Sequence, residues 1–280
     1  MSLVSMKSLL ARTRRGETAL PAFNVDNLEI LEGVIQAATE LNEPIIVAVG
    51  QGAIRSGRIS SMAELTKSMA QNISVPIALH LDHATDVEQI MFAVQIGFTS
   101  IMYDGSSLPL NENIKNSKRV QQILGDKDIS LEAELGALDG SEDGICPSKS
   151  SEITFDDVQH FLKEVTVDAL ALAIGNAHGI YKVAPTLNYK LLREVSKFSR
   201  VPLVLHGGSG LNDNVIRKLI ACGIQKINVA TELRIAFMKG IQKTAGEDFA
   251  LASAQAVNHV KKVALAKIKL FTTSGKEERD

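Results

Sequence analysis

The chain has 280 residues, of which 45% are hydrophobic and 22% are charged, and its formal net charge is −2. This near-neutral balance, with no block of Lys or Arg, argues against nucleic acid as a partner and is compatible with phosphorylated small molecules. No apolar run approaches the roughly 20 residues of a membrane span, so we expect no membrane association. The two cysteines, Cys146 and Cys222, form no C-x-x-C motif, which favours a reducing compartment and hence the cytoplasm.

The first predicted element lies within Met1–Gly16, a segment with three arginines and no acid. We interpret it as an amphipathic helix that covers the base of the fold, with a transit peptide as the alternative. Beyond it, short apolar runs alternate with segments of helical periodicity. Most of the runs are apolar throughout, as expected for strands that are buried on both faces. The predicted strands are Ala19–Val25, Pro44–Val49, Pro76–Asp82, Thr99–Tyr103, Ile129–Leu135, Asp168–Ile174, Val201–His206 and Ile224–Val229.

Helical segments separate these strands, and several begin with an Asp or Asn cap. Examples are Asn27–Leu41, Asp86–Ile96, Asp156–Glu164, Asn188–Lys197 and Asp213–Ala221. After the eighth strand, Glu232–Leu270 is predicted to be helical throughout. Eight strand–helix units predict a closed (β/α)8 TIM barrel, an α/β fold, with extra C-terminal helices; an open doubly wound sheet is the alternative. Such a barrel needs about 250 residues, so we expect residues 1–280 to form a single domain.

Residues that can carry chemistry collect at the ends of the predicted strands, which form the active face of such barrels. One histidine at a strand end is usually structural, but His83, His178 and His206 would converge on the same face. Three imidazoles suit a catalytic zinc ion with an open fourth position. Asp104 and Glu134 also end strands. They would form a second cation site, orient the histidines, or cap nearby amides.

A phosphate site is predicted on the same face. Gly207-Gly208-Ser209-Gly210 follows the seventh strand, and Asn228-Val229-Ala230-Thr231 opens the helix after the eighth. Barrels commonly bind phosphate at these two positions through backbone N–H groups. Metal, phosphate and carboxylates together indicate proton and carbonyl chemistry on a phosphorylated compound. A Schiff-base route needs a buried lysine at a strand end, whereas Lys226 lies within the eighth strand, so the metal route is favoured.

The motifs His-Leu-Asp-His, Glu-Ala-Glu-Leu-Gly, Ala-His-Gly, Leu-His-Gly-Gly-Ser-Gly and Ile-Asn-Val-Ala-Thr-Glu-Leu-Arg occur here in this order. The chain thereby resembles the class II ketose-bisphosphate aldolases, in particular the tagatose-bisphosphate branch, from Met6 to Phe271. The resemblance implies a zinc-dependent lyase that cleaves a ketose 1-phosphate or 1,6-bisphosphate to dihydroxyacetone phosphate and an aldehyde through a metal-stabilised enediolate. It also implies a homodimer or homotetramer, and it leaves open an additional monovalent or second divalent cation.

The resemblance assigns a role to each matching position. It implies that His83, His178 and His206 bind zinc and that Asp82 is the acid/base for the hydroxyl generated from the aldehyde. Glu142, in the irregular stretch Gly136–Glu152 that we interpret as a candidate lid, matches the residue that takes the proton from the hydroxymethyl carbon. Asp104 and Glu134 match positions that hold an alternative or second metal in some members. The positions that match contacts of dihydroxyacetone phosphate are Gly179, Gly207, Gly208, Ser209, Asn228, Val229, Ala230 and Thr231.

The remaining histidines match no catalytic position. His160 and His259 are predicted to lie on helix surfaces. His80 lies two residues before Asp82 on a strand and is predicted to support it from the same face.

Two tolerable departures from the family are Asn176 before Ala-His-Gly, where Thr or Ser is usual, and Ala84 after His83, where Gly is common. The distal phosphate site departs further. Bisphosphate-specific members hold this phosphate with a serine after the second strand and an arginine near the C-terminal helices. Here Gly50 follows the second strand, and no arginine occurs between Arg234 and Arg279.

The half of the site that binds dihydroxyacetone phosphate is therefore expected to be intact, while the aldehyde half differs. Arg55 and Arg58, just after the second strand, are the alternative source of positive charge. Two other functions stay open from the sequence: a metal-dependent sugar-phosphate epimerase and a non-catalytic, accessory barrel subunit of such an aldolase. An accessory subunit would be expected to lack a zinc ligand or Asp82, and none of these is missing.

Overall fold

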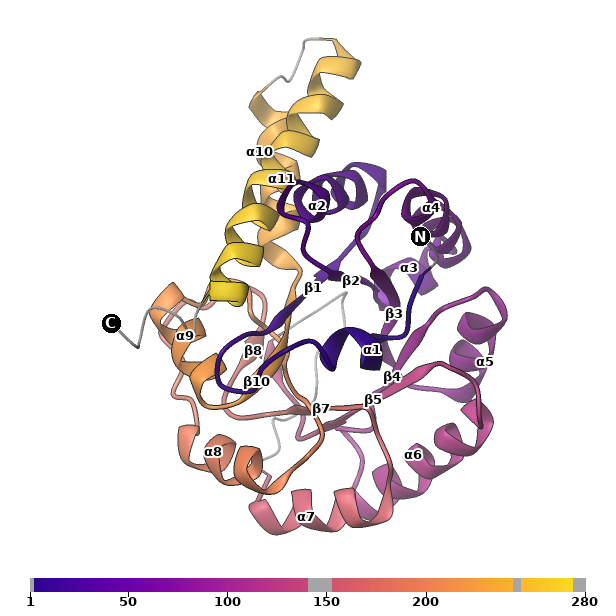
Figure 1. Cartoon of the computed structure of the whole chain (residues 1–280), viewed down its shortest axis with the longest axis vertical. Coiled ribbons are helices and arrows are strands. Elements are labelled where there is room, and N and C mark those ends of the chain that lie inside the picture. Colours follow the sequence, from indigo (N-terminus) through magenta and orange to yellow (C-terminus); the bar gives the residue numbers. More distant parts are fainter. Residues whose placement is uncertain (1–2, 141–152, 244–247, 274–280) are drawn as a thin grey trace.

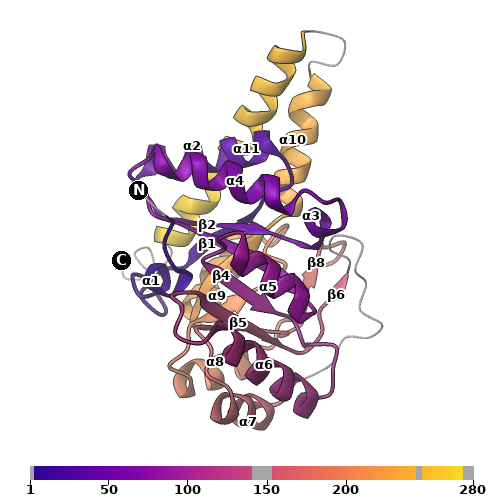
Figure 2. The same ribbon diagram turned by 90° about the vertical axis from the view of Figure 1, so that its right-hand side faces the viewer.

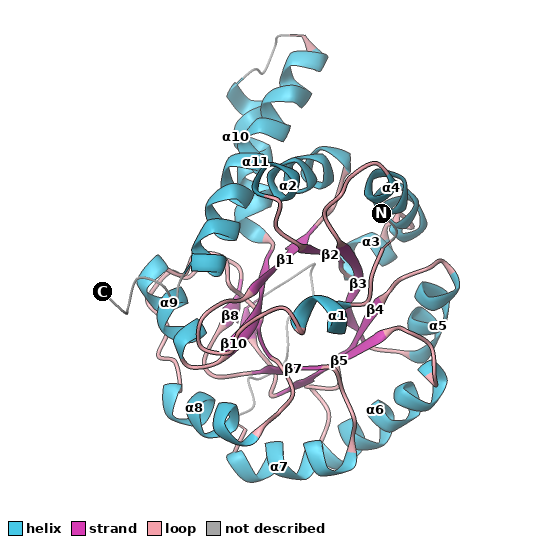
Figure 3. Ribbon diagram, in the orientation of Figure 1, coloured by secondary structure: helices cyan, strands magenta, loops and turns pink. Residues whose placement is uncertain are grey.

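The computed structural model describes residues 3–140, 153–243 and 248–273. Eight parallel strands close into a barrel in the order β1-β10-β9-β7-β5-β4-β3-β2, with helices around it (Figure 1, Figure 3). The predicted fold class is thus confirmed, and each of the eight predicted strands contributes one barrel strand. The barrel strands are β1 (Leu20–Asn24), β2 (Ile45–Val49), β3 (Ile77–Ala84), β4 (Ser100–Tyr103), β5 (Ser130–Leu135), β7 (Ala169–Leu172), β9 (Leu203–Leu205) and β10 (Ile224–Val229).

Outside the barrel, β6 (Asp139–Gly140) and β8 (Ala177–His178) pair as a separate two-stranded sheet. The helices are α1 (Met6–Leu10), α2 (Leu28–Leu41), α3 (Gln51–Arg55), α4 (Ile59–Gln71), α5 (Val87–Gln95), α6 (Leu110–Leu124), α7 (Phe155–Glu164), α8 (Tyr189–Phe198), α9 (Asp213–Ala221), α10 (Thr231–Lys243) and α11 (Phe249–Thr273).

Local sequence signals explain where the helices begin. The side chain of Asn27 accepts a hydrogen bond from the Ile30 backbone N–H at the start of α2, and Asp86 does the same for Gln89 at the start of α5. None of the described helices is long and apolar enough to cross a membrane.

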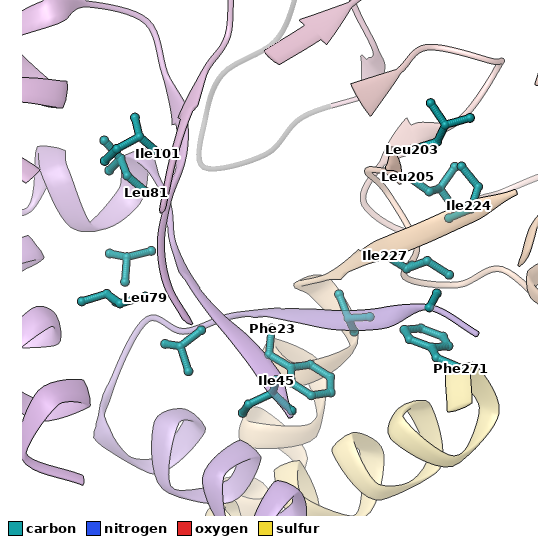
Figure 4. Close-up of a cluster of buried hydrophobic side chains, with 14 of the residues drawn as sticks. Phe23, Ile45, Leu79, Leu81, Ile101, Leu203, Leu205, Ile224, Ile227 and Phe271 are labelled. Carbon is teal, nitrogen blue, oxygen red and sulfur yellow. The ribbon is translucent and has the colours of Figure 1, made fainter. Parts of the chain in front are cut away.

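The core has two parts. The larger part lies between the barrel and the surrounding helices, and Figure 4 shows Phe23, Ile45 and Phe271 where β1 and β2 meet α11. The smaller part fills the base of the barrel, where Met6 and Leu9 of α1 pack on small side chains of the strands. The first helix thus covers the base, as predicted, and Figure 2 shows it on the side opposite β6 and β8.

The predicted C-terminal helices are present, but Glu232–Leu270 is not helical throughout, because Asp248 lies outside a helix. The structure has two helices in this region, α10 and α11, which lie side by side and extend beyond the barrel (Figure 1, Figure 2). Gly240 allows the close approach of the pair, because a Cβ atom there would clash with the Cα of Ala256 and lie 2.7 Å from its backbone nitrogen. Folding back lets each helix cover apolar side chains of the other, which a single straight helix would leave exposed.

We predict that Gly240→Ala lowers the free energy of unfolding by about 1–3 kcal/mol. In an uncrowded helix this change would be stabilising by roughly 0.5–1 kcal/mol, but here the added methyl meets backbone atoms that cannot rotate away. Urea unfolding checks the result, with Lys239→Ala, an exposed neighbour on α10, as the matched control. Equal or greater stability of Gly240→Ala would show that the helices separate at little cost.

Candidate active site

The site begins with an irregularity at the end of β3. His83 has φ 53°, in the left-handed region, and the register between β3 and β4 shifts between Leu81 and Ala84. In a regular strand the consecutive residues Asp82 and His83 would point to opposite faces. Here one ligand atom from each lies within 4.8 Å of the other and of one from His206. The bulge therefore turns both side chains toward the same site.

Three imidazole rings meet at this face. The ring centroid of His83 lies 4.6 Å from that of His206 and 5.1 Å from that of His178, and the last two are 6.2 Å apart. They come from β3, from β8 and from the residue after β9. In the small sheet His178 is paired with Gly140, the last residue of the described segment 3–140. The structure thus brings together the three histidines that the sequence singled out.

Two of these rings are hydrogen-bonded to carboxylates. The Nδ1 atom of His83 lies 2.8 Å from Asp104 Oδ2, and Nε2 of His206 lies 3.0 Å from Glu132 Oε1. Nδ1 of His206 is buried and has no hydrogen-bond partner among the described residues. An unmet polar atom of this kind costs about 1–3 kcal/mol, which a bound metal ion would offset. Imidazole nitrogens backed by carboxylates suit zinc, so these residues fit that ion.

The charges of the cluster are strongly coupled. Burial would lower the pKa of His83. The surrounding carboxylates, of which Asp82 has the largest effect, nevertheless raise this pKa well above its usual value. Burial and the Asp104 carboxylate raise the pKa of Glu134 well above its usual value. Burial would raise the pKa of Asp82, but nearby cationic groups, first His83, hold it below its usual range. Asp82 therefore favours the ionised form, whereas the environment of Glu134 favours its protonated form.

Asp82 is fully buried and is held by two amides. Nδ2 of Asn24 donates to Asp82 Oδ2 at 2.6 Å, and Nδ2 of Asn228 lies 3.2 Å from the same oxygen. Nε2 of His80 lies 3.7 Å from Asp82 Oδ1, in accord with its predicted position on the same face. The sequence analysis missed Asn24. Its signal was a single amide at the C-terminal end of the apolar strand β1.

The glycine-rich turn after β9 packs tightly on its neighbours. Gly207 has φ 67°, and a Cβ atom at Gly208 would lie 2.7 Å from the Asn228 carbonyl oxygen. The Ser209 hydroxyl accepts hydrogen bonds from the backbone N–H groups of Ala230 (3.2 Å) and Glu232 (3.3 Å) at the start of α10. The turn and the first residues of α10 therefore form one rigid unit beside the histidines.

A tyrosine that the sequence analysis missed fixes the other side of this turn. The Tyr181 hydroxyl donates to the Gly207 carbonyl oxygen at 2.9 Å and accepts from the Ala177 N–H at 2.9 Å. It thereby ties the turn to β8 and to His178. Gly179, which follows His178, has φ 93°, and no atom of the described residues lies within 4 Å of the place that a Cβ atom would take. Nothing in the local sequence signalled this role, because it depends on the turn of another strand.

The residues expected near the distal end of the substrate are on or near α3. The Gln51 side chain, at the start of this helix, donates to the His83 carbonyl oxygen at 2.8 Å, so α3 adjoins the metal-binding cluster. Arg55 lies one turn later on the same helix, and both Arg55 and Arg58 are exposed. Glu142 lies outside the described residues. His160 is exposed on α7, and His259 is partly buried on α11.

The comparisons with known proteins agree with this geometry. A family model of class-II fructose-bisphosphate aldolases matches residues 4–276. The chain belongs to this family. It is therefore an aldolase, a carbon–carbon lyase. It is 39% identical over 245 residues to a sulfofructosephosphate aldolase of Alkalicoccus urumqiensis, covering 87% of this chain and 85% of the relative.

Two further relatives of this aldolase span nearly its whole length. A fructose-bisphosphate aldolase of Geobacillus stearothermophilus is 34% identical over 284 residues, which cover 99% of each chain. The crystal structure of the YdjI aldolase of Escherichia coli K12 superposes with a TM-score of 0.84 at 33% identity, covering 98% of this chain and 99% of that one. The family and its barrel are thus shared by relatives whose names indicate different substrates.

Proposed function

We propose that this aldolase is zinc-dependent and reversibly cleaves a ketose 1-phosphate to dihydroxyacetone phosphate and an aldehyde. The observation that carries the proposal is the cluster of three imidazoles and an ionised, buried Asp82 beside the glycine-rich turn. His83, His178 and His206 would hold the ion. When bound, zinc polarises the carbonyl group of the ketose and stabilises the charge that develops on its oxygen.

Asp82 would act as the base in cleavage. It accepts the proton of the hydroxyl group next to the bond that breaks, and the O–H electron pair forms the aldehyde carbonyl. The C–C bonding pair then moves toward the ketose carbonyl, and the hydroxymethyl carbon is left to accept a proton. The amides of Asn24 and Asn228 would fix the carboxylate at the hydroxyl. We propose, from the sequence, that Glu142 supplies and removes the proton at the carbon.

The turn Gly207–Gly210 and the segment Asn228–Thr231 would bind the phosphate of dihydroxyacetone phosphate, together with Gly179. The segment Asn228–Thr231 leads into the start of α10, whose dipole favours an anion. The Ser209 hydroxyl already accepts two N–H groups there, so its role would be to hold the helix start in place.

Asp104 and Glu134 would either orient His83 or bind a second cation. The contact between Asp104 and His83 Nδ1 supports a role in orienting that ring, leaving Nε2 for the ion. His83, Asp104 and Glu134 also form the second group of residues that could hold a cation. Binding of a second divalent cation there remains the alternative role for the pair.

We expect about one zinc ion per chain and loss of cleavage after chelation. His83→Ala, His178→Ala and His206→Ala should each lose both zinc and activity, whereas His160→Ala, on the surface of α7, should lose neither. Because neighbouring carboxylates raise the pKa of His83, protons compete with zinc for this imidazole. Zinc affinity should therefore increase as the pH rises above the usual pKa of a histidine, as isothermal titration at a series of pH values would show. Full turnover by a metal-free enzyme would contradict the mechanism.

Replacing each of the two proposed proton-transfer residues should impair a different half-reaction. Glu142→Ala should stop the exchange of the dihydroxyacetone phosphate C–H proton with solvent, while Asp82→Ala should depress carbon–carbon cleavage and retain much of that exchange. NMR in deuterated water measures the exchange, and Asp143→Ala is the control for a neighbouring acid. The opposite pattern would reverse the two roles.

We propose that the distal end of the substrate does not carry a phosphate. Gly50 lacks the hydroxyl group, and α10 and α11 beyond Arg234 lack the arginine, that would hold a distal phosphate. Arg234 itself is engaged by Asp26 at 2.6 Å. The relative called sulfofructosephosphate aldolase acts, by its name, on a fructose phosphate with a sulfo group. A ketose 1-phosphate with a sulfo group or an uncharged tip is therefore the proposed substrate, with Arg55 or Arg58 meeting an anionic tip.

A substrate panel tests this proposal. We expect sulfofructose phosphate or fructose 1-phosphate to have a higher kcat/KM than fructose or tagatose 1,6-bisphosphate. Replacing both Arg55 and Arg58 by Ala should reduce kcat/KM only for the anion-tipped substrate, because each charge-assisted hydrogen bond contributes about 1.5–3 kcal/mol. Arg119→Ala, exposed on α6, is the control. A bisphosphate preferred by more than about tenfold, roughly 1.4 kcal/mol, would overturn the proposal.

A further inference from the structure

A charged network lies inside the barrel beneath the histidine cluster. Lys226 of β10, Glu132 of β5 and His80 of β3 are all fully buried. The Lys226 ammonium lies 2.9 Å from Glu132 Oε1, 2.7 Å from Glu132 Oε2 and 3.4 Å from His80 Nε2. A buried ion pair is weak evidence for stability, because removing charges from water costs several kcal/mol per ion. Its position next to the candidate metal ligands suggests a different use.

The Lys226 ammonium fixes the direction of every hydrogen bond around it. This group has three N–H donors and no acceptor, and its three contacts account for all of them. Nε2 of His80 must therefore accept, so that the proton of this ring lies on Nδ1. That proton points to the Ser100 hydroxyl, 2.7 Å away.

The same direction continues to the metal site through Glu132. This carboxylate faces Lys226 with both oxygens, and an ionised carboxylate can only accept hydrogen bonds. Nε2 of His206, 3.0 Å from Glu132 Oε1, must then be the donor. The proton of the His206 ring is thus held on Nε2, and its lone pair lies on Nδ1. That atom is the one that is buried with no hydrogen-bond partner in the described part of the chain.

We propose that Lys226 and Glu132 are positioning residues that fix the tautomer of His206, so that Nδ1 is its metal-binding atom. The inference rests on the proposed zinc site and deepens it. In this proposal the two residues act through their contact with His206 and not by binding substrate or metal themselves. Loss of a partner that orients a metal-binding histidine typically weakens metal affinity by about 10–100-fold.

The decisive test compares zinc dissociation constants, measured by competition with a chelator. Lys226→Met alone leaves the Glu132 carboxylate buried without its counter-charge and is expected to destabilise the fold. The double variant Lys226→Met, Glu132→Gln removes both charges at similar volume. The Gln amide presents a donor at one end and an acceptor at the other, so it no longer dictates the tautomer of His206. We expect this variant to remain folded and to bind zinc about 10–100-fold more weakly than the wild type.

Gln225→Ala is the matched control. Gln225 is buried next to Lys226 on β10, but its side chain contacts Thr13 and Arg15 on the outside of the barrel. Its replacement should leave the zinc dissociation constant unchanged. A double variant that binds zinc as tightly as the wild type would overturn the inference while leaving the zinc site itself intact. Failure of the wild type to bind zinc would instead refute the proposed function.

A crystal structure of the zinc-loaded wild type gives a second, independent test that needs no variant. Coordination of His206 through Nδ1, with Nε2 still bonded to Glu132, is the expected result. Coordination through Nε2 would overturn the inference, even if the double variant does not fold.

Discussion

The closure of eight parallel strands into one ring is the constraint on which the rest of the structure depends. Closure places every strand end on the same face, so residues that are far apart in sequence become neighbours. It also divides the interior into two levels. The base is filled by small apolar side chains and covered by α1, whereas the upper level contains charged and polar groups. The candidate active site lies in the upper level, where polar side chains are available, and the lower level is filled by apolar packing.

Charge balance is the second constraint, and it follows from the first. The upper level contains Asp82 and Glu132, which are fully buried, and an isolated ion in such a place would be very costly. Lys226 provides the counter-charge for Glu132, and hydrogen bonds from His206 to Glu132 and from Asn24 and Asn228 to Asp82 stabilise the two carboxylates. As a result the pKa of Glu132 is lowered to about 2. The charge of Lys226 and the hydrogen bond that His206 donates to Glu132 outweigh the effect of burial. Each charged group is therefore stable only in the presence of the others, and the site is a single electrostatic unit.

The two halves of the proposed substrate site differ in how they are built. The half for dihydroxyacetone phosphate consists of backbone groups held by Ser209 and Tyr181, in a turn where added Cβ atoms would clash. Such a unit is hard to change without loss of the fold. The distal half depends on exposed side chains at the end of α3 and after it, which can change at little cost to stability. Relatives that share the barrel but carry the names of different substrates are consistent with this division.

The sequence by itself determined the barrel, the strands at whose ends His83 and His206 lie, and the position of the glycine-rich turn. It could do so because buried strands, caps and strand-end motifs are local patterns. It predicted extra C-terminal helices but not where the segment divides into α10 and α11, a division that depends on close packing at Gly240. Nor did it reveal the amide of Asn24 on Asp82 or the direction of hydrogen bonds from Lys226 to His206. These were decided only by the tertiary structure, because strand register and the bulge at His83 set which side chains meet across the barrel.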